Sequence, residues 1–120
     1  MRTSEKSKTI EVAILGPGKG WVRRTIPHTL ESFQEVVGGY LEALSGIQGA
    51  VVYVNEDGRD RDLPPSAAWV KRPGMPVSVL LGPILALGPV DQNGLETSLD
   101  DDAFSKVKML IKPLPSAGGV

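Results

Sequence analysis

The glycine-rich segment at positions 16–20 holds the first residue types that could do chemistry. Its sequence, Gly16-Pro17-Gly18-Lys19-Gly20, combines flexible backbone with a lysine, and such loops can bind phosphate. The phosphate-loop pattern G-x-x-x-x-G-K-[ST] lies between a strand and a helix, whereas here the spacing differs and a second strand is expected to follow. The segment therefore favours a hairpin turn with a solvated lysine, and a phosphate site is the alternative.

Two groups of aspartates could hold a divalent cation, because hydrolytic metal sites use carboxylates. Residues 100–102 are better explained as the acidic start of a helix, and the aspartates at 57, 60 and 62 alternate with arginines that cancel their charge. His28 is the one histidine, no nucleophile motif accompanies it, and cysteine is absent. We therefore expect no enzyme activity, no catalytic residue, no metal site and no cofactor.

A basic and aromatic strand offers contacts to a small ligand. Trp21 and Arg23 share one face of the expected strand and follow Lys19, so they could bind a nucleotide or phosphate. Arg24 falls on the opposite face, which should be the core face, so the strand would have to lie at an edge. Alternatively, Trp21 and Trp69 cover the core.

The elements that position these residues are read from hydrophobic periodicity. Alternation of Ile10, Val12 and Ile14 predicts a strand over 9–15, and residues 21–26 complete a hairpin. The β-branched run at 50–54 predicts a central strand.

A long amphipathic helix is expected after Thr29, which is a good N-cap. Its apolar stripe runs from Leu30 to Leu44, and Gly46 supplies the stop. Gly38 and Gly39 would lie inside it, which implies close approach of a neighbour, or of a ligand to the backbone.

The C-terminal half is less regular. Residues 66–69 are expected to form a short helical turn, and Gly82-Pro83 should bend the apolar stretch 77–87. Ser98 and Asp101 fit a capping box for a last helix, which Pro113 ends. The resulting class is α+β: a small, mostly antiparallel sheet in the order β-β-α-β-β-α, with one long helix packed on one face. We expect a disordered tail at 1–8, a single domain at 9–112 and a flexible tail at 113–120.

Composition narrows the classes of partner. The 120 residues include 13 basic and 14 acidic ones, a net charge of -1, so no overall field attracts nucleic acid or membrane. Neither an apolar run of 18 residues nor a secretory signal is present, and we expect a cytoplasmic protein without a membrane or nucleic-acid partner.

Three segments of the chain form a recognisable set of motifs: residues 29–42 with the run VGGYLE, then Asn55-Glu56-Asp57-Gly58, then Leu63-Pro64-Pro65-Ser66. Together they resemble the family called domain of unknown function 3846. The family has the order hairpin, "LQ-x-x-VGG-x-[IL]-E" helix, "NE-x-G" turn and "LPPN", and the resemblance covers roughly residues 9–111. The chain departs at Ser66, where the family tends to asparagine. The resemblance implies a protein often carried by phages, plasmids and their bacterial hosts, and no established activity.

The leading hypothesis is a non-catalytic binding protein of a mobile element that contacts a host protein. Its candidate surface joins five residues at the helix end and the following turn: Tyr40, Glu42, Asn55, Glu56 and Arg59. The alternative is a small-molecule or signalling-nucleotide binder, a sponge, that uses Lys19, Trp21, Arg23 and Arg24.

Overall fold

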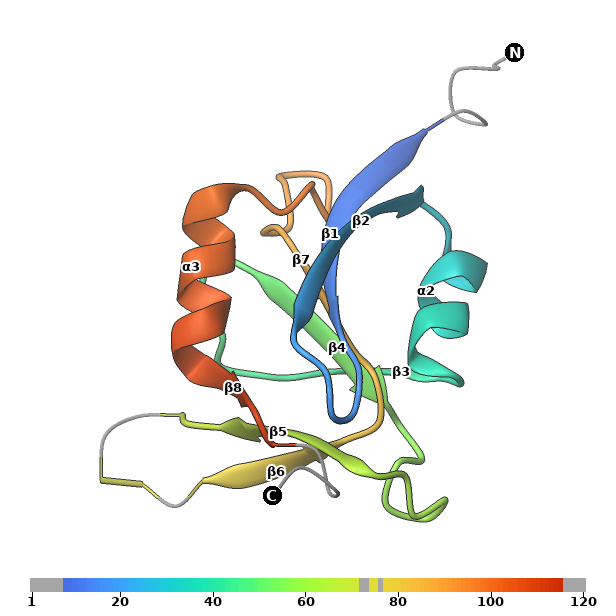
Figure 1. Ribbon diagram of the computed structural model, residues 1–120. Helices are drawn as coiled ribbons and strands as arrows, with labels where there is room; N and C mark the ends of the chain where they lie inside the picture. The colour runs from blue at the N-terminus through green and yellow to red at the C-terminus, as the bar shows by residue number, and fades with distance from the viewer. Residues whose placement is uncertain (1–7, 72–73, 76, 116–120) are drawn as a thin grey trace.

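The chain forms two antiparallel sheets and two helices within the part that the structure describes (Figure 1). The structure is a computed structural model, and it describes residues 8–71, 74–75 and 77–115. The elements follow in the order β1 (Thr9–Leu15), β2 (Trp21–Pro27), α2 (Leu30–Val37), β3 (Leu41–Ala43), β4 (Val51–Asn55), β5 (Pro65–Trp69), β6 (Ser78–Leu81), β7 (Ile84–Leu87), α3 (Asp101–Leu110) and β8 (Ile111–Pro113). The predicted α+β class is confirmed.

The larger sheet has five strands in the order β2-β1-β7-β4-β3, and the smaller has three in the order β6-β5-β8. The predicted hairpin is confirmed, because β1 and β2 pair from Thr9↔Pro27 to Leu15↔Trp21. The strand predicted at 50–54 is also confirmed as an inner strand, since β4 lies between β7 and β3.

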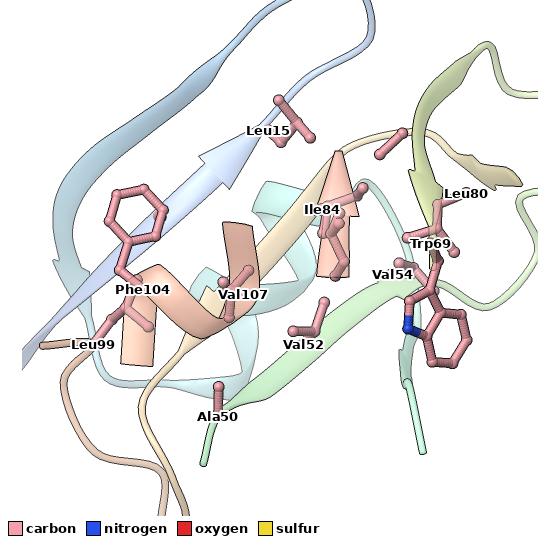
Figure 2. Close-up of a cluster of buried hydrophobic side chains, with 14 of the residues drawn as sticks. Leu15, Ala50, Val52, Val54, Trp69, Leu80, Ile84, Leu99, Phe104 and Val107 are labelled. Atoms are coloured by element: carbon pink, nitrogen blue, oxygen red, sulfur yellow. The ribbon is translucent and has the colours of Figure 1, made fainter. Parts of the chain in front are cut away.

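The larger sheet is covered on both faces, as Figure 1 shows with α2 and α3 on opposite sides. Along β1, Ile10 and Val12 pack with α2, whereas Ala13 and Leu15 pack toward α3. This alternation places a separate apolar cluster on each face. The cluster under α3 also takes in the smaller sheet, and Figure 2 shows Trp69 and Leu80 beside Val54 in the same core.

The predicted long helix is wrong. α2 has eight residues and ends at Gly38, whose φ of 82° is the left-handed conformation of a helix C-cap. Residues 41–43 then form β3, so Gly38 and Gly39 lie outside the helix. Thr29 is the N-cap as predicted, and its side chain accepts a hydrogen bond from the Ser32 amide.

The expected helical turn at 66–69 is also wrong, because these residues belong to β5. The bend predicted at Gly82-Pro83 is real, and it moves the chain from β6 in the smaller sheet to β7 in the larger one. Gly82 has a φ of 77°, and its carbonyl accepts a hydrogen bond from the buried Ser66 hydroxyl.

The last helix begins later than expected. Asp100 is its N-cap, with the side chain accepting from the Ala103 amide, while the Ser98 hydroxyl accepts from the Glu11 amide. Pro113, where a flexible tail was expected to start, ends β8, and the Leu114 amide donates to Ser66. Of the tails expected at 1–8 and 113–120, residues 1–7 and 116–120 lie outside the described residues.

Across the described residues, neither helix is long and apolar enough to cross a membrane.

Candidate functional site

One cleft brings together four of the five residues of the leading sequence prediction. It has a volume of about 500 Å³ and lies between edge strand β3, the turn after β4, and edge strand β6. We call it the β3–β6 cleft. Its lining residues are Glu42, Leu44, Val54, Asn55, Glu56, Gly58, Arg59, Asp60, Trp69, Lys71, Ser78, Val79, Leu80 and Leu81.

The pairing of β3 with β4 explains this gathering, because Glu42 lies opposite Val54 and Leu41 lies opposite Asn55. The turn after β4 is held to β3 by the Glu56 amide, which donates to the Tyr40 carbonyl at 2.9 Å. Tyr40 itself does not line the cleft, and its side chain is largely exposed. Four residues of the prediction therefore share one site and the fifth lies beside it.

Asn55 contributes to the shape of the cleft, and its side chain is engaged within the protein. It is 4% exposed, its Nδ2 donates to the Val37 carbonyl at 3.1 Å, and its Oδ1 accepts from the Asp57 amide at 2.7 Å. These bonds join the end of α2 to the turn after β4. The charges left to meet a partner come from the acids Glu42, Glu56 and Asp60 and the bases Arg59 and Lys71.

Trp69 forms an apolar part of the cleft wall and is 8% exposed. The Lys71 ammonium lies 4.5 Å from the centroid of its ring, a cation–π contact. The prediction that Trp69 covers the core is confirmed, since it packs in the cluster that also holds α3.

The edge of the smaller sheet that borders this cleft carries no charge. Among the four edge strands, β2 carries Arg23 and Arg24, β3 carries Glu42, and β8 carries Lys112, whereas β6 (Ser78–Leu81) is uncharged. Natural proteins usually blunt sheet edges with charged residues, bulges or short strands. Three large apolar residues on and before β6 are also exposed: Met75 at 46%, Val77 at 54% and Val79 at 49%.

The residues of the alternative prediction lie outside the β3–β6 cleft, and two of them make contacts within the protein. Arg23 is held by α3 and the loop before it, with Nη1 2.9 Å from Asp101 Oδ1 and Nη2 donating to the Leu99 carbonyl. Trp21 packs edge-to-face on Phe104 with ring centroids 5.9 Å apart. Lys19 lies exposed in the hairpin turn, and Arg24 is exposed because β2 is an edge strand.

A second polar cluster, which sequence reasoning missed, lies on the α2 face of the larger sheet. His28 Nε2 lies 3.2 Å from Glu96 Oε1, and the Tyr53 hydroxyl donates to Glu96 Oε2 at 2.5 Å. The Phe33 ring lies 5.8 Å from His28 and 6.1 Å from Tyr53, centroid to centroid. These residues line a pocket of about 560 Å³.

The pKa values in this cluster reflect burial and hydrogen bonding. Burial alone would raise the pKa of Glu96, but hydrogen bonds from Tyr53 and His28 outweigh burial and lower the pKa below its ordinary value. Burial and the neighbouring Glu96 raise the pKa of Tyr53. Glu96 is therefore an ionised carboxylate held by two donors at neutral pH, beside a neutral tyrosine.

The acidic side chains were also candidates for holding a metal ion. In the described parts of the chain, no three His, Cys, Asp or Glu side chains come close enough to hold a metal ion. Asp101 pairs with Arg23, and Asp102 lies 3.6 Å from the Lys106 ammonium on α3.

The comparisons with known proteins find one family. A family model described as domain of unknown function (DUF3846) matches residues 10–112. No curated protein and no solved structure matches the chain.

Proposed function

Because the chain belongs to the family of domain of unknown function 3846, whose description assigns no activity, we propose its binding function from the geometry. The protein is a non-catalytic binding protein that holds an extended segment of a partner protein in the β3–β6 cleft.

The observation that carries this proposal is the uncharged edge of β6. Within the described residues, β6 pairs with β5 on one side only, which leaves backbone amides and carbonyls on its other side. An extended segment that adds a strand there gains main-chain hydrogen bonds, and its alternate side chains gain contacts. Val77 and Val79 offer apolar surface to such a strand.

The charges of the cleft would select the partner. Arg59 and Lys71 stand near the acids Glu42, Glu56 and Asp60, so both signs are present along one groove. Charges at an interface raise the association rate and reject wrong partners more than they add affinity. A segment with an apolar stretch and charges of both signs fits this lining best.

A selection from a display library of random twelve-residue peptides tests the proposal without a known partner. The dissociation constant of the selected peptides is then measured for the wild type, Val79→Lys and Val90→Lys. Val90 is the matched control for Val79, because the two residues are of the same type and are 51% and 49% exposed. We expect Val79→Lys to weaken binding about tenfold or more, since a charge on an edge opposes strand addition, and Val90→Lys to change it little.

Equal affinity of the Val79→Lys and Val90→Lys variants for the selected peptides would contradict the proposal. So would a wild type that forms a stable dimer in solution and loses it in Val79→Lys, because β6 would then pair with a second copy. Measured masses in solution of the wild type and both variants distinguish these outcomes.

The source of the partner is proposed on the family resemblance alone. The protein acts for a phage or plasmid, and the partner is a protein of the bacterial host. Capture of partners from lysate with wild type, Val79→Lys and Val90→Lys baits tests this, and a host protein retained by all except Val79→Lys is the expected result.

The small-molecule or nucleotide-binding alternative, at Lys19, Trp21, Arg23 and Arg24, has less support. The Arg23 guanidinium already donates hydrogen bonds to Asp101 and to the Leu99 carbonyl, and the Trp21 ring packs on Phe104. A nucleotide that bound through Arg23 and Trp21 would compete with these contacts.

A further inference from the structure

The pocket on the α2 face has the features of a second binding site, unconnected with the β3–β6 cleft. We call it the Glu96 pocket. It is lined by Lys8, His28, Thr29, Leu30, Phe33, Leu41, Tyr53, Asp91, Leu95 and Glu96. None of these residues lines the β3–β6 cleft.

The Glu96 carboxylate is the charge with the most defined position in this pocket. Its side chain is 19% exposed and is fixed by one donor on each oxygen, Tyr53 on Oε2 and His28 on Oε1. A carboxylate oxygen has two acceptor positions, so each oxygen can accept one further hydrogen bond. The pocket therefore presents an oriented acceptor pair in partly apolar surroundings.

The walls around this carboxylate are apolar. Leu30 at the start of α2 and Leu95 next to Glu96 are 59% and 56% exposed, and Leu41 and Phe33 add further apolar surface to the lining. Among the residues that the structure describes, folding leaves this leucine surface exposed. An apolar ligand body would shield it from water, which is the main source of affinity in small-molecule sites.

We propose that the Glu96 pocket binds a small amphipathic organic cation, a protonated amine on an aliphatic or aromatic body. The ammonium group donates to the Glu96 oxygens, and the apolar body lies against Leu30, Leu41 and Leu95. Hydrogen bonds between charged groups are about twice as strong as neutral ones, so the charge, and not the shape alone, decides which ligand binds.

The other charged or titratable groups around the pocket are Lys8, His28 and Asp91. Lys8 is exposed, so solvent screens its repulsion of a cation more than it screens the attraction of the less exposed Glu96. His28 has Nε2 directed at Glu96. Asp91 Oδ1 accepts hydrogen bonds from the backbone amides of Asn93 and Leu95. Asp91 adds a second negative charge at the rim of the pocket.

Three probes of nearly equal size test the proposal: 2-phenylethylamine, neutral 2-phenylethanol and anionic 3-phenylpropionate. Their dissociation constants are measured at pH 7.5 from backbone amide shifts in NMR spectra. We expect the amine to bind about tenfold more tightly than the alcohol, the anion to bind weakest, and the shifts to centre on His28, Tyr53 and Glu96.

Variants locate the two halves of the site. Glu96→Gln should bring the amine-to-alcohol ratio of affinities close to one, while alcohol binding remains. Leu95→Ser, a change at an exposed position, should weaken amine and alcohol by the same factor. Glu56→Gln, in the β3–β6 cleft, should leave the ratio unchanged and serves as the matched control.

Three results would each overturn the proposal. One is the absence of backbone amide shifts around Glu96 at about 10 mM 2-phenylethylamine, a concentration at which even a weak complex would be partly formed. Another is an anion that binds as tightly as the amine, which would assign the pocket to Lys8 and His28. The third is amine binding that neither Glu96→Gln nor Leu95→Ser changes. The Val79→Lys variant should keep amine binding, so failure here and failure of the proposed partner site are separate results.

Discussion

At the scale of single residues, the Asn55 side chain joins two segments of the chain. Its side chain bonds to the end of α2 and to the turn after β4, and it leaves no room beside it at Gly39. A Cβ added at Gly39 would lie 2.8 Å from Asn55 Nδ2. The VGG run thus combines a glycine that caps a helix with a glycine that packs against a buried amide.

Gly39→Ala should therefore lower the free energy of unfolding by about 1–3 kcal/mol through overpacking. Asn55 cannot move aside without losing its bonds to Val37 and Asp57. Gly20→Ala is the control, because nothing lies within 4 Å of its added Cβ. Urea unfolding of both variants checks this, and a Gly39→Ala protein as stable as Gly20→Ala would show that the contact is not tight.

Glu96 should make stability depend on pH in the acid range. The pKa of Glu96 is lowered in the folded protein, so the ionised carboxylate stabilises the fold. This contribution to the free energy of unfolding is fully present above the unfolded pKa, ordinarily about 4.5, and is lost as the pH falls through that value and below. Between pH 7 and pH 3, the melting temperature should fall less steeply for Glu96→Gln than for the wild type. Glu35→Gln, an exposed change on α2, should keep the wild-type slope; equal slopes for all three proteins would rule out this role.

Sequence reasoning could find the individual residues of the β3–β6 cleft but not those of the Glu96 pocket. Glu42, Asn55, Glu56 and Arg59 are close in the chain, and one strand pair brings them together. Glu96 lies 43 residues from Tyr53 and 68 from His28, so no local spacing links them.

The crossing from β6 to β7 links the two sheets at the scale of elements. Gly82 turns the chain with a positive φ, and the Ser66 hydroxyl of β5 satisfies its buried carbonyl.

Ser66→Ala should reduce stability by about 1–3 kcal/mol, because it leaves the Gly82 carbonyl without its partner in a fully buried place. Ser105→Ala, on the exposed face of α3, should change stability by no more than about 0.5 kcal/mol. Calorimetric melting of the two variants measures the difference, and a harmless Ser66→Ala would mean that water or another group satisfies the carbonyl.

The ends of helices and strands could be predicted where turn-forming residues agreed with the spacing of the apolar residues. The alternation in 9–15 and the loop Gly16–Gly20 give the hairpin correctly. The stripe from Leu30 to Leu44 is misleading, because Leu41 and Leu44 follow the helical spacing by coincidence while Gly38 ends the helix. The glycine pair was the available signal of a C-cap.

The whole molecule carries two candidate surfaces on different sides of the larger sheet. Tyr53 and Val54 are neighbours on β4, and because side chains alternate across a strand, one faces the Glu96 pocket and the other the β3–β6 cleft. Sequence patterns gave the α+β class, but not the division into two sheets, because the pairing of β5 with β8 joins segments over forty residues apart. The role in a mobile element and the cytoplasmic location stay predictions.

Amide hydrogen exchange of the protein bound to a selected peptide tests the central claim most directly, because strand addition must hydrogen-bond the free edge of β6. We expect exchange of the amides in Ser78–Leu81 that face the free edge to slow by about tenfold or more on binding, while exchange at the edge strand Trp21–Pro27 stays unchanged. Saturating peptide that leaves exchange at Ser78–Leu81 unaltered would contradict the account.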